Sequence, residues 1–346
     1  MKRLVSVLTA VLFMTGMAVG QNNQSTTTQT GDNNSANITQ SGESNESAVE
    51  QLSDNNSSDV DQTGTDNYNY IIQDNEHRLS EMGNSATVQQ NGEDNDSWIF
   101  QNQSNRASVD GSAEVTQDGT DNQSTVLQGL MFQEADVYQY GTNNDSYIDQ
   151  DRGSAVGNVA EVSQNGENNI SNIKQVGANS AYVTQEGTGN VADVDQEETN
   201  YANLEMYGNN NKIIANQVSG NDTEAWPSEP SNSIDFTVEG YRNSAKMGNS
   251  DIRLMQDGEF NVIEGIGWNT LYYNGDDAEQ FTIKQEGEGN VVEGVAGHIN
   301  KANRLDLNIQ QMGESNTIQF NTQGADNKIN INQNGMSNSA VVNQSL

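Results

Sequence analysis

Short runs of alternating polar and apolar residues recur along most of the chain, and most of them close on a glutamine. In one of the first runs, Ala36 and Ile38 stand two residues apart, Asn34 precedes them and Gln40 follows. Residues two apart in an extended strand point to the same face of a sheet. The pattern therefore predicts short β-strands whose inward face carries Asn, a small residue, a β-branched residue and Gln.

These runs repeat with a period of eleven residues. The unit Gln29 to Gln40 has Gly31 between its first Gln and its Asn, and the unit Gln40 to Gln51 keeps the same offsets. The residues around each glycine are too few for a helix and suit a tight reversal with glycine at positive φ. We expect an all-β fold, a β-solenoid of roughly 22-residue coils with two strands per coil and two facing parallel sheets, amyloid-like in its stacking.

The inward Gln and Asn side chains need partners, because buried amides are costly when unpaired. Stacked at equivalent positions, each amide donates to one neighbouring coil and accepts from the other. We expect such structural ladders at Gln29, Asn34, Gln40, Asn45, Gln51, Gln139, Asn144, Gln150, Gln164, Asn169, Gln175, Gln185, Asn190, Gln196, Gln311, Asn316, Asn327, Gln333, Asn338 and Gln344. We expect turn glycines at Gly31, Gly42, Gly64, Gly92, Gly119, Gly141, Gly166, Gly187, Gly313, Gly324 and Gly335.

Changes in the pattern divide the chain into segments. A short polar lead, 21–28, precedes a repeat array at 29–221, and a second, partly irregular array occupies 234–344. The stretch 222–233 is acidic, lacks alternation and contains both prolines, Pro227 and Pro230. Proline cannot donate to an interior ladder, so we expect this stretch to leave the array.

Residues 1–20 have the form of a Sec signal peptide. Lys2 and Arg3 precede an apolar run from Leu4 to Phe13, and Ala18 to Gly20 supply small residues for cleavage. The run is short for a membrane anchor, since spanning about 30 Å of hydrocarbon takes about 20 apolar residues. We expect the mature protein to begin near Gln21 and to be secreted.

Composition narrows the function further. The chain carries 49 acidic and 14 basic residues, for a net charge of -35, and has no cysteine. Its hydrophobic content of 32% alone would suggest disorder, but the few apolar residues fall in register. The negative charge argues against a nucleic-acid partner, because phosphates are bound by Lys and Arg.

No pattern indicates an enzyme or a cofactor. His77 and His298 are the only histidines, far apart in sequence, and are better explained as solvated residues than as catalytic groups or metal ligands. No Gly-x-Ser-x-Gly elbow is present. The acid pairs at 197–198 and 276–277 resemble glycosidase carboxylates only superficially, since acids recur throughout.

Calcium is the one ion that the sequence brings into consideration. Acidic turns such as those at Asp94 and Asp121 would stack from coil to coil and offer oxygen ligands. The nonapeptide motif of calcium-binding β-rolls is absent. We therefore expect cations mainly to screen the charge, so that added salt or Ca²⁺ speeds self-association.

The units Gln139 to Gln150 and Gln185 to Gln196, with the pattern Gln-x-Gly-x-x-Asn-x-Ala/Ser-x-Val/Ile-x-Gln, resemble the curlin repeat of bacterial curli subunits. The resemblance covers most of 29–344. It implies a secreted functional amyloid that is exported through a dedicated outer-membrane channel, polymerises at the cell surface with the help of a nucleator, and serves biofilm matrix and adhesion. The length, the proline-containing stretch and the acidity leave open whether the chain is a major subunit, a nucleator or a divergent relative.

The ends of the pattern favour head-to-tail self-association, because clean units lie near both ends and a monomeric solenoid normally carries caps. The alternative is a monomeric β-solenoid adhesin that recognises a surface, a carbohydrate or ice. Trp98 and Tyr147 fall on outward positions and are available for such contacts, although scattered exposed aromatic residues are ordinary.

Overall fold

The computed structural model describes residues 22–74, 83–101, 110–129, 132–151, 157–198, 200–218, 221–227, 233–240, 250–256, 262–270, 280–285, 291–293, 296–299, 306–313, 315–323 and 328–344. These residues form 28 strands and no helix. Side chains are described up to residue 215, apart from 198, and again at 313, 315–319 and 331–341, with the same gaps. The predicted signal peptide, 1–20, lies outside the described residues.

The strands belong to two sheets that the chain visits in turn. The 15-stranded sheet, called sheet A, contains β1 (Gln24–Gln29), β3 (Glu46–Gln51), β5 (Tyr68–Gln73), β7 (Asp96–Gln101), β9 (Gln123–Gln128), β11 (Asp145–Asp151), β13 (Ile170–Gly177), β15 (Val191–Glu198), β17 (Lys212–Val218), β19 (Ser233–Gly240), β21 (Val262–Thr270), β23 (Val291–Glu293), β24 (Ala296–Ile299), β26 (Thr317–Gln323) and β28 (Ser339–Gln344).

The 13-stranded sheet, called sheet B, contains β2 (Ser35–Glu43), β4 (Ser57–Thr65), β6 (Ser85–Glu93), β8 (Ser112–Thr120), β10 (Glu134–Thr142), β12 (Val159–Glu167), β14 (Ser180–Thr188), β16 (Tyr201–Tyr207), β18 (Asn221–Pro227), β20 (Ser250–Gln256), β22 (Gln280–Gln285), β25 (Asp306–Met312) and β27 (Lys328–Asn334).

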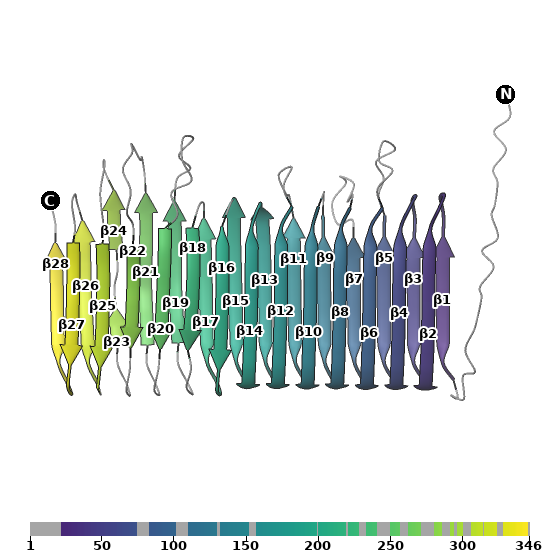
Figure 1. Cartoon of the computed structure of the whole chain (residues 1–346), viewed down its shortest axis with the longest axis horizontal. Coiled ribbons are helices and arrows are strands. Elements are labelled where there is room, and N and C mark those ends of the chain that lie inside the picture. The colour runs from purple at the N-terminus through teal and green to yellow at the C-terminus, as the bar shows by residue number, and fades with distance from the viewer. Residues whose placement is uncertain are drawn as a thin grey trace, which may run out of the picture.

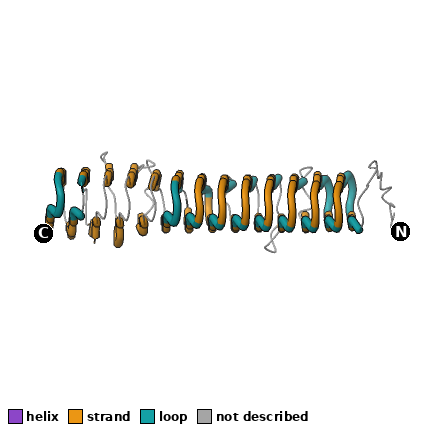
Figure 2. The backbone as a smooth tube through the Cα atoms, turned by 90° about the horizontal axis from the view of Figure 1, so that it is seen from below, coloured by secondary structure: helices purple, strands orange, loops and turns teal. Residues whose placement is uncertain are grey.

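Apart from the strands at the two ends, the strands pair in parallel with strands of the coil before and the coil after. Strand β10, for example, lies between β8 and β12, and β11 lies between β9 and β13. Figure 1 shows the strands side by side along the long axis of the molecule, and Figure 2 shows the two layers edge-on. The predicted all-β solenoid with two strands per coil and two facing parallel sheets is confirmed. Strands β1 to β16 make eight coils with side chains described almost throughout.

Identical residue types face one another across neighbouring strands. Ala113, Ala135 and Ala160 align on β8, β10 and β12, as do the glutamines and glycines of these strands. The register holds although equivalent glutamines of successive coils in sheet B are separated by 21 to 28 residues. The extra residues lie in the turns from sheet A to sheet B, so the strands keep their pairing.

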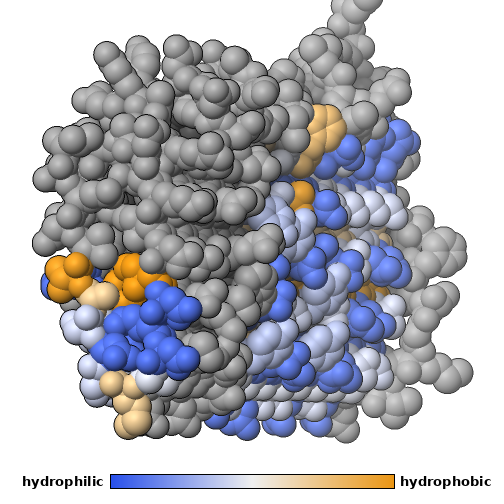
Figure 3. All heavy atoms as spheres, turned by 60° about the vertical axis from the view of Figure 1, so that its left-hand side comes forward, coloured by the Kyte–Doolittle hydropathy of each residue, from blue (hydrophilic) through white to orange (hydrophobic). Residues whose placement is uncertain are grey.

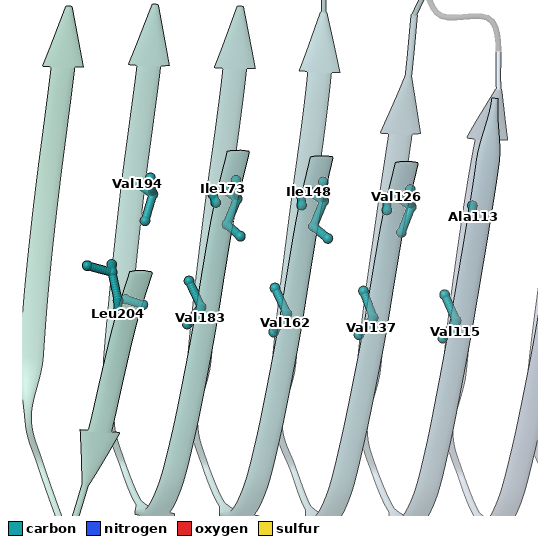
Figure 4. Packing of buried hydrophobic residues seen from close by; sticks show 14 of the residues in the cluster. Ala113, Val115, Val126, Val137, Ile148, Val162, Ile173, Val183, Val194 and Leu204 are labelled. Carbon is teal, nitrogen blue, oxygen red and sulfur yellow. The ribbon is translucent and has the colours of Figure 1, made fainter. Parts of the chain in front are cut away.

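The core is a thin layer of small and β-branched side chains between the sheets. Ile148, Ile173 and Val194 from sheet A form one row, and Val137, Val162 and Val183 from sheet B form another (Figure 4). All six are almost completely buried. The strands bury every second residue, as β3 buries Ser47, Val49 and Gln51, because successive side chains of a strand point to opposite faces.

The structure places residues 222–227 of the stretch 222–233 inside the array, in contrast to the expectation, while 228–232 lie outside the described residues. Strand β18, Asn221–Pro227, lies in sheet B between β16 and β20. The ladder between β16 and β18 ends at Ala225, two residues before Pro227, so the missing N–H of Pro227 breaks no bond of that ladder. Pro230 lies outside the described residues.

No helix of the described residues has the length and apolar character needed to cross a membrane.

We expect Ile173→Ala to lower the free energy of unfolding by about 2–4 kcal/mol, because the fully buried side chain would leave a cavity between the sheets. Urea unfolding followed by circular dichroism measures the effect. Ile170→Ala, on the same strand but with a side chain that is 45% exposed, is the matched control and should change the stability by less than about 0.5 kcal/mol. Equal effects of the two substitutions would contradict the assignment of the core face.

Candidate functional site: stacked amide ladders

Two glutamine ladders run through the interior, one along each sheet. In sheet A the Nε2 atom of each glutamine donates to Oε1 of the glutamine one coil further on, at 2.7 to 3.1 Å. This ladder contains Gln29, Gln51, Gln73, Gln101, Gln128, Gln150, Gln175 and Gln196. The sheet B ladder has donor–acceptor distances of 2.8 to 2.9 Å. It contains Gln40, Gln62, Gln90, Gln117, Gln139, Gln164 and Gln185.

Backbone contacts fix the orientation of these amides. Gln73 Nε2 also donates to the carbonyl of Ser57 at 2.9 Å, and Gln117 Nε2 donates to the carbonyl of Asp96 at 2.9 Å. A carbonyl only accepts hydrogen bonds, so the Nε2 atom must point toward it. In each bond between two glutamines, Nε2 therefore donates to Oε1 of the glutamine in the next coil, toward the C-terminal end of the solenoid.

An asparagine ladder follows the turns from sheet B to sheet A and runs in the opposite direction. Asn67 Nδ2 donates to Asn45 Oδ1 at 3.0 Å, and Asn95 Nδ2 donates to Asn67 Oδ1 at 3.0 Å. The backbone N–H of Asn67 also donates to Asn45 Oδ1, at 3.1 Å, which identifies this atom as the acceptor. The same bonds continue through Asn122, Asn144 and Asn169.

A second asparagine column follows the turns from sheet A to sheet B and is less regular. Its positions are occupied by Asn34, Asn56, Asn84, Asn158, Asn179 and Asn200, with Gly111 and Gln133 at two further positions. Gln133 turns its Nε2 back to the carbonyl of Gly129 at 3.0 Å, and within the described residues Asn158 Nδ2 has no hydrogen-bond acceptor. The amide column is thus interrupted on the side of the solenoid where the turns vary in length.

One edge of the solenoid carries a continuous column of glycines. Gly42, Gly64, Gly92, Gly119, Gly141, Gly166 and Gly187 all have positive φ, from 106° to 138°. A Cβ atom on any of them would lie 1.9 to 2.2 Å from the carbonyl oxygen of the next glycine in the column. These turns therefore require glycine for two reasons, the backbone conformation and the close approach of the next coil.

The residues predicted as a site are mostly brought together by the structure. The predicted glutamines from Gln29 to Gln196 lie in the two glutamine ladders, and Asn45, Asn144, Asn169 and Asn190 lie in the regular asparagine column. Asn34 belongs to the irregular column, and Gly31 lies on that same edge, away from the other predicted glycines. Near the C-terminus, Gln311 aligns with Gln333, and Asn338 donates its backbone N–H to Asn316 Oδ1 at 3.0 Å. Gly313 packs on Gly335.

Some predicted residues are placed only partly. Gln344 aligns with Thr322, but its side chain is not described, and Asn327 and Gly324 lie outside the described residues.

These columns also contain residues that were not among the predicted ones. Ladder positions are occupied by Gln62, Gln73, Gln90 and Gln117, and a turn position by Gly208. Their spacing from the neighbouring repeat residues is the sequence signal that could have predicted them. The sheet B glutamine ladder ends at Met206, which aligns with Gln185, and Pro227 aligns with Gln256 at the equivalent position. The side chains of methionine and proline have no amide group, so the sheet B glutamine ladder is interrupted between Gln185 and Gln256.

The residues considered for metal or catalytic chemistry lie apart. Asp94 and Asp121 adopt left-handed backbone conformations in the turns that follow the glycine column, with φ of 54° and 56°. Among the described residues, no group of three or more His, Cys, Asp or Glu side chains has an arrangement suited to a metal ion. His298 lies on β24, aligned with Asn269, and His77 lies outside the described residues. Of the acid pairs, Glu197 is exposed at the end of β15, the Glu198 side chain is not described, and Asp276 and Asp277 lie outside the described residues.

Three carboxylates line up on the outer face of sheet B. Glu114, Asp136 and Glu161 occupy equivalent positions of β8, β10 and β12. Burial and the charges of Glu134, Glu114 and Glu161 raise the pKa of Asp136 to about 6. The same surroundings raise the pKa of the adjacent Tyr138 to about 12. Stacking in register therefore brings like charges together on the surface as well as amides inside.

These features define a class of protein: a β-solenoid whose coils are joined by in-register amide and glycine columns. Residues 31–64 match the model of the family described as Curlin associated repeat, which confirms the resemblance seen in the sequence. The matched residues run from Gly31 through β2, β3 and β4 to Gly64, and the later coils continue their columns. A search of curated proteins found no match to this chain.

We expect Gln139→Ala to lower the free energy of unfolding by about 1–3 kcal/mol. The substitution removes the side-chain acceptor of Gln117, the amide donor to Gln164 and the donor to the Gln123 carbonyl. The buried Gln164 Oε1 then lacks its amide donor, and Gln117 Nε2 keeps only backbone acceptors. Urea unfolding measures the change. Gln123→Ala, which removes an exposed amide, is the control, and a Gln139→Ala variant as stable as the control would contradict a stabilising role for the ladder.

We expect Gly119→Ala to destabilise the solenoid more than Gly335→Ala. A methyl group on Gly119 would lie 1.9 Å from the Gly141 carbonyl oxygen, whereas one on Gly335 has Asn338 Nδ2 as its nearest neighbour, at 3.5 Å. Both residues have positive φ, 138° and 112°, so the pair separates the steric contact from the backbone strain. Thermal unfolding of the two variants should show the larger loss for Gly119→Ala, and equal losses would mean that backbone strain alone matters.

We expect Asp136→Asn to stabilise the protein by about 1 kcal/mol at pH 7 and to have little effect at pH 4, after allowance for solvent screening of a half-buried group. The folded pKa, about 6, lies above the ordinary value of 3.8, so the folded state binds the proton more tightly than the unfolded state. The contribution of this group to stability is therefore greatest below pH 4 and is lost as the pH rises toward 6. Urea midpoints at both pH values measure the effect, with Glu93→Gln as the charge-matched control, and a stabilisation that is the same at pH 4 and pH 7 would contradict it.

Proposed function

We propose that this chain is a secreted, curli-like structural subunit that adds end to end to further copies and builds an extracellular amyloid fibre for biofilm matrix and adhesion. The curlin-associated repeat supports the coarse assignment to a structural, self-assembling family whose fibres lie at the cell surface. The proposal includes export through the Sec pathway and an outer-membrane channel, and a separate nucleator. It assigns the protein no catalytic activity and no required cofactor.

The observation that carries the proposal is the direction of the ladders. Each glutamine–glutamine bond donates toward the C-terminal end, and each asparagine–asparagine bond donates toward the N-terminal end. The asparagine Nδ2 atoms also donate to a glycine carbonyl of the following coil, as from Asn67 to Gly92 at 3.0 Å. One end of a stack therefore offers glutamine acceptors and asparagine donors, and the other offers the complementary groups. A second copy added in the same orientation continues both ladders, whereas an inverted copy would place like groups against each other.

The backbone supports the same geometry. In the described residues β1 and β2 at one end, and β27 and β28 at the other, each pair with a single strand. An outer strand presents unpaired N–H and C=O groups that template the addition of another strand. Parallel in-register stacking of such coils is the arrangement of a cross-β fibre.

The first experiment follows the chain from Gln21 to Leu346 after dilution from denaturant, with thioflavin fluorescence, electron microscopy and fibre diffraction. We expect unbranched fibres with a meridional reflection near about 4.8 Å, and shorter lag times on seeding and on addition of salt, which screens the charge of the subunits. A stable, monodisperse monomer with β-type circular dichroism would contradict the proposal and favour a solenoid adhesin.

A proline substitution on β1 tests whether this strand is the edge to which further copies add. The N–H groups of Gln24 and Thr30 donate to the second coil, so those of the odd-numbered residues between them face away from it. Thr27→Pro removes one N–H from the outer edge and leaves the pairing of β1 with β3 intact. We expect this variant to fold but to elongate slowly, with Thr27→Ala as the control. Unchanged elongation of Thr27→Pro would mean that β1 is not the growing edge.

A further inference from the structure

The outer faces of the two sheets differ. The outward positions of sheet B hold mainly Ser, Thr, Asn and acidic residues, and the described surface in Figure 3 is mostly blue and white. The outward aromatic side chains described on sheet B are tyrosines, and among them the rings of Tyr182 and Tyr201 lie 5.7 Å apart, measured between centroids. On sheet A, by contrast, Tyr68 and Tyr70 of β5 and Trp98 and Phe100 of β7 all point outward. We call these four residues the aromatic patch.

The rings of the aromatic patch contact one another. The Trp98 ring lies 5.2 Å from that of Tyr68, 5.5 Å from that of Tyr70 and 6.1 Å from that of Phe100, measured between centroids. Ile72 and Leu127 extend the patch along the next outward column, since Ile72 aligns with Phe100 and Phe100 aligns with Leu127. Trp98 is therefore not a scattered exposed aromatic residue but the centre of a partly exposed cluster.

The charged groups around the patch are all acidic among the outward residues of β3, β5, β7, β9 and β11. Glu46 and Glu50 lie on β3, Asp96 lies on β7, and Asp145 and Asp149 lie on β11. The Tyr70 hydroxyl donates to Glu50 Oε1 at 3.2 Å. Lys174 on β13 is the first outward base that follows.

Asp96 supplies a second, independent observation. Its Oδ1 atom is buried and has no hydrogen-bond partner within the described residues, although Trp98 donates a hydrogen bond to the carboxylate. Burial raises the pKa of this group. A buried acceptor without a partner is costly, so a positive charge placed over this part of the sheet would be stabilising.

We propose that the aromatic patch and its acidic border bind an arginine-bearing segment of a basic peptide. Aromatic faces attract cations, with indole the strongest, and a guanidinium stacks on rings while it pairs with carboxylates. Small ligands are usually held in concave pockets, whereas this surface is the outer face of a sheet and suits an extended chain. The net charge of -35 steers a basic partner toward the protein and repels a second copy from this face.

Binding of a fluorescein-labelled (Gly-Arg)₄ peptide to the chain from Gln21 to Leu346, followed by fluorescence anisotropy, tests the proposal. The measurement is made in 0.15 M and 1 M NaCl, because a Debye length of about 3 Å at 1 M suppresses general attraction to the acidic surface. We expect binding to persist at 1 M and a neutral (Gly-Gln)₄ peptide to bind at least about tenfold more weakly. Equal binding of the neutral peptide would show an apolar surface without charge preference and would overturn the proposal.

The variant Tyr70→Thr with Trp98→Thr removes the centre of the patch. Threonine already occupies the aligned positions Thr26 and Thr125 of sheet A, so the strands should keep their pairing. We expect a loss of affinity of roughly tenfold or more at 1 M NaCl. Tyr138→Thr on sheet B is the control, since it removes an outward aromatic side chain from a column that holds Thr116 and Thr184.

A second variant, Glu50→Gln with Asp96→Asn, keeps the rings and removes two charges. We expect it to bind the arginine peptide more weakly and to reduce the preference over the neutral peptide, while circular dichroism stays unchanged. Equal weakening by Tyr138→Thr, or full affinity in both patch variants, would assign the binding to general charge attraction and overturn the proposal. Because neither measurement depends on fibre growth, failure of the proposed polymerisation would leave this test intact.

Discussion

In-register stacking of identical coils is the constraint on which the rest of this structure depends. The interior between the sheets is thin, and its apolar residues are few, yet the amides that share it are satisfied because each one meets its own equivalent 21 to 28 residues later. A single coil would leave these amides exposed to water or unpaired. The coil conformation with its buried amides is therefore stable only in the stack and not in a single repeat, as in other solenoids.

The same constraint gives the molecule a chemical direction. Parallel strands already distinguish the two ends of a sheet, and the glutamine and asparagine ladders add donors and acceptors that differ between the ends. The glycine column sets the closest approach of the coils along one edge. The opposite edge accommodates turns of different lengths because no glycine column lies there, so variation in sequence is possible without loss of register.

Stacking also places outward residues in columns, where side chains of like charge can come close together and lower the stability of the fold. It brings Glu114, Asp136 and Glu161 together on sheet B, at an electrostatic cost that raises the pKa of Asp136 to about 6. It also brings the aromatic rings of β5 and β7 into contact on sheet A. An array of this kind can thus carry different surfaces on its two faces while the interior stays constant.

The sequence by itself determined most of the strands, their inward and outward faces and the residue types that form the ladders. An alternation of period two and a repeat of eleven residues leave little freedom, and Gln40, Ala36 and Ile38 could only point to one side. The match at 31–64 rests on the same local pattern.

Only the tertiary structure decided which residues from different coils meet. The repeat does not reveal that Trp98 lies beside Tyr70, 28 residues earlier, because the extra residues in the turn between their coils hide the alignment. Nor does it show that Asn221–Pro227 pairs as a strand, since local composition argued against it and pairing with β20 outweighed that preference. The direction of the ladders and the steric need for glycine likewise follow from contacts between coils, which arise only when the chain is wound.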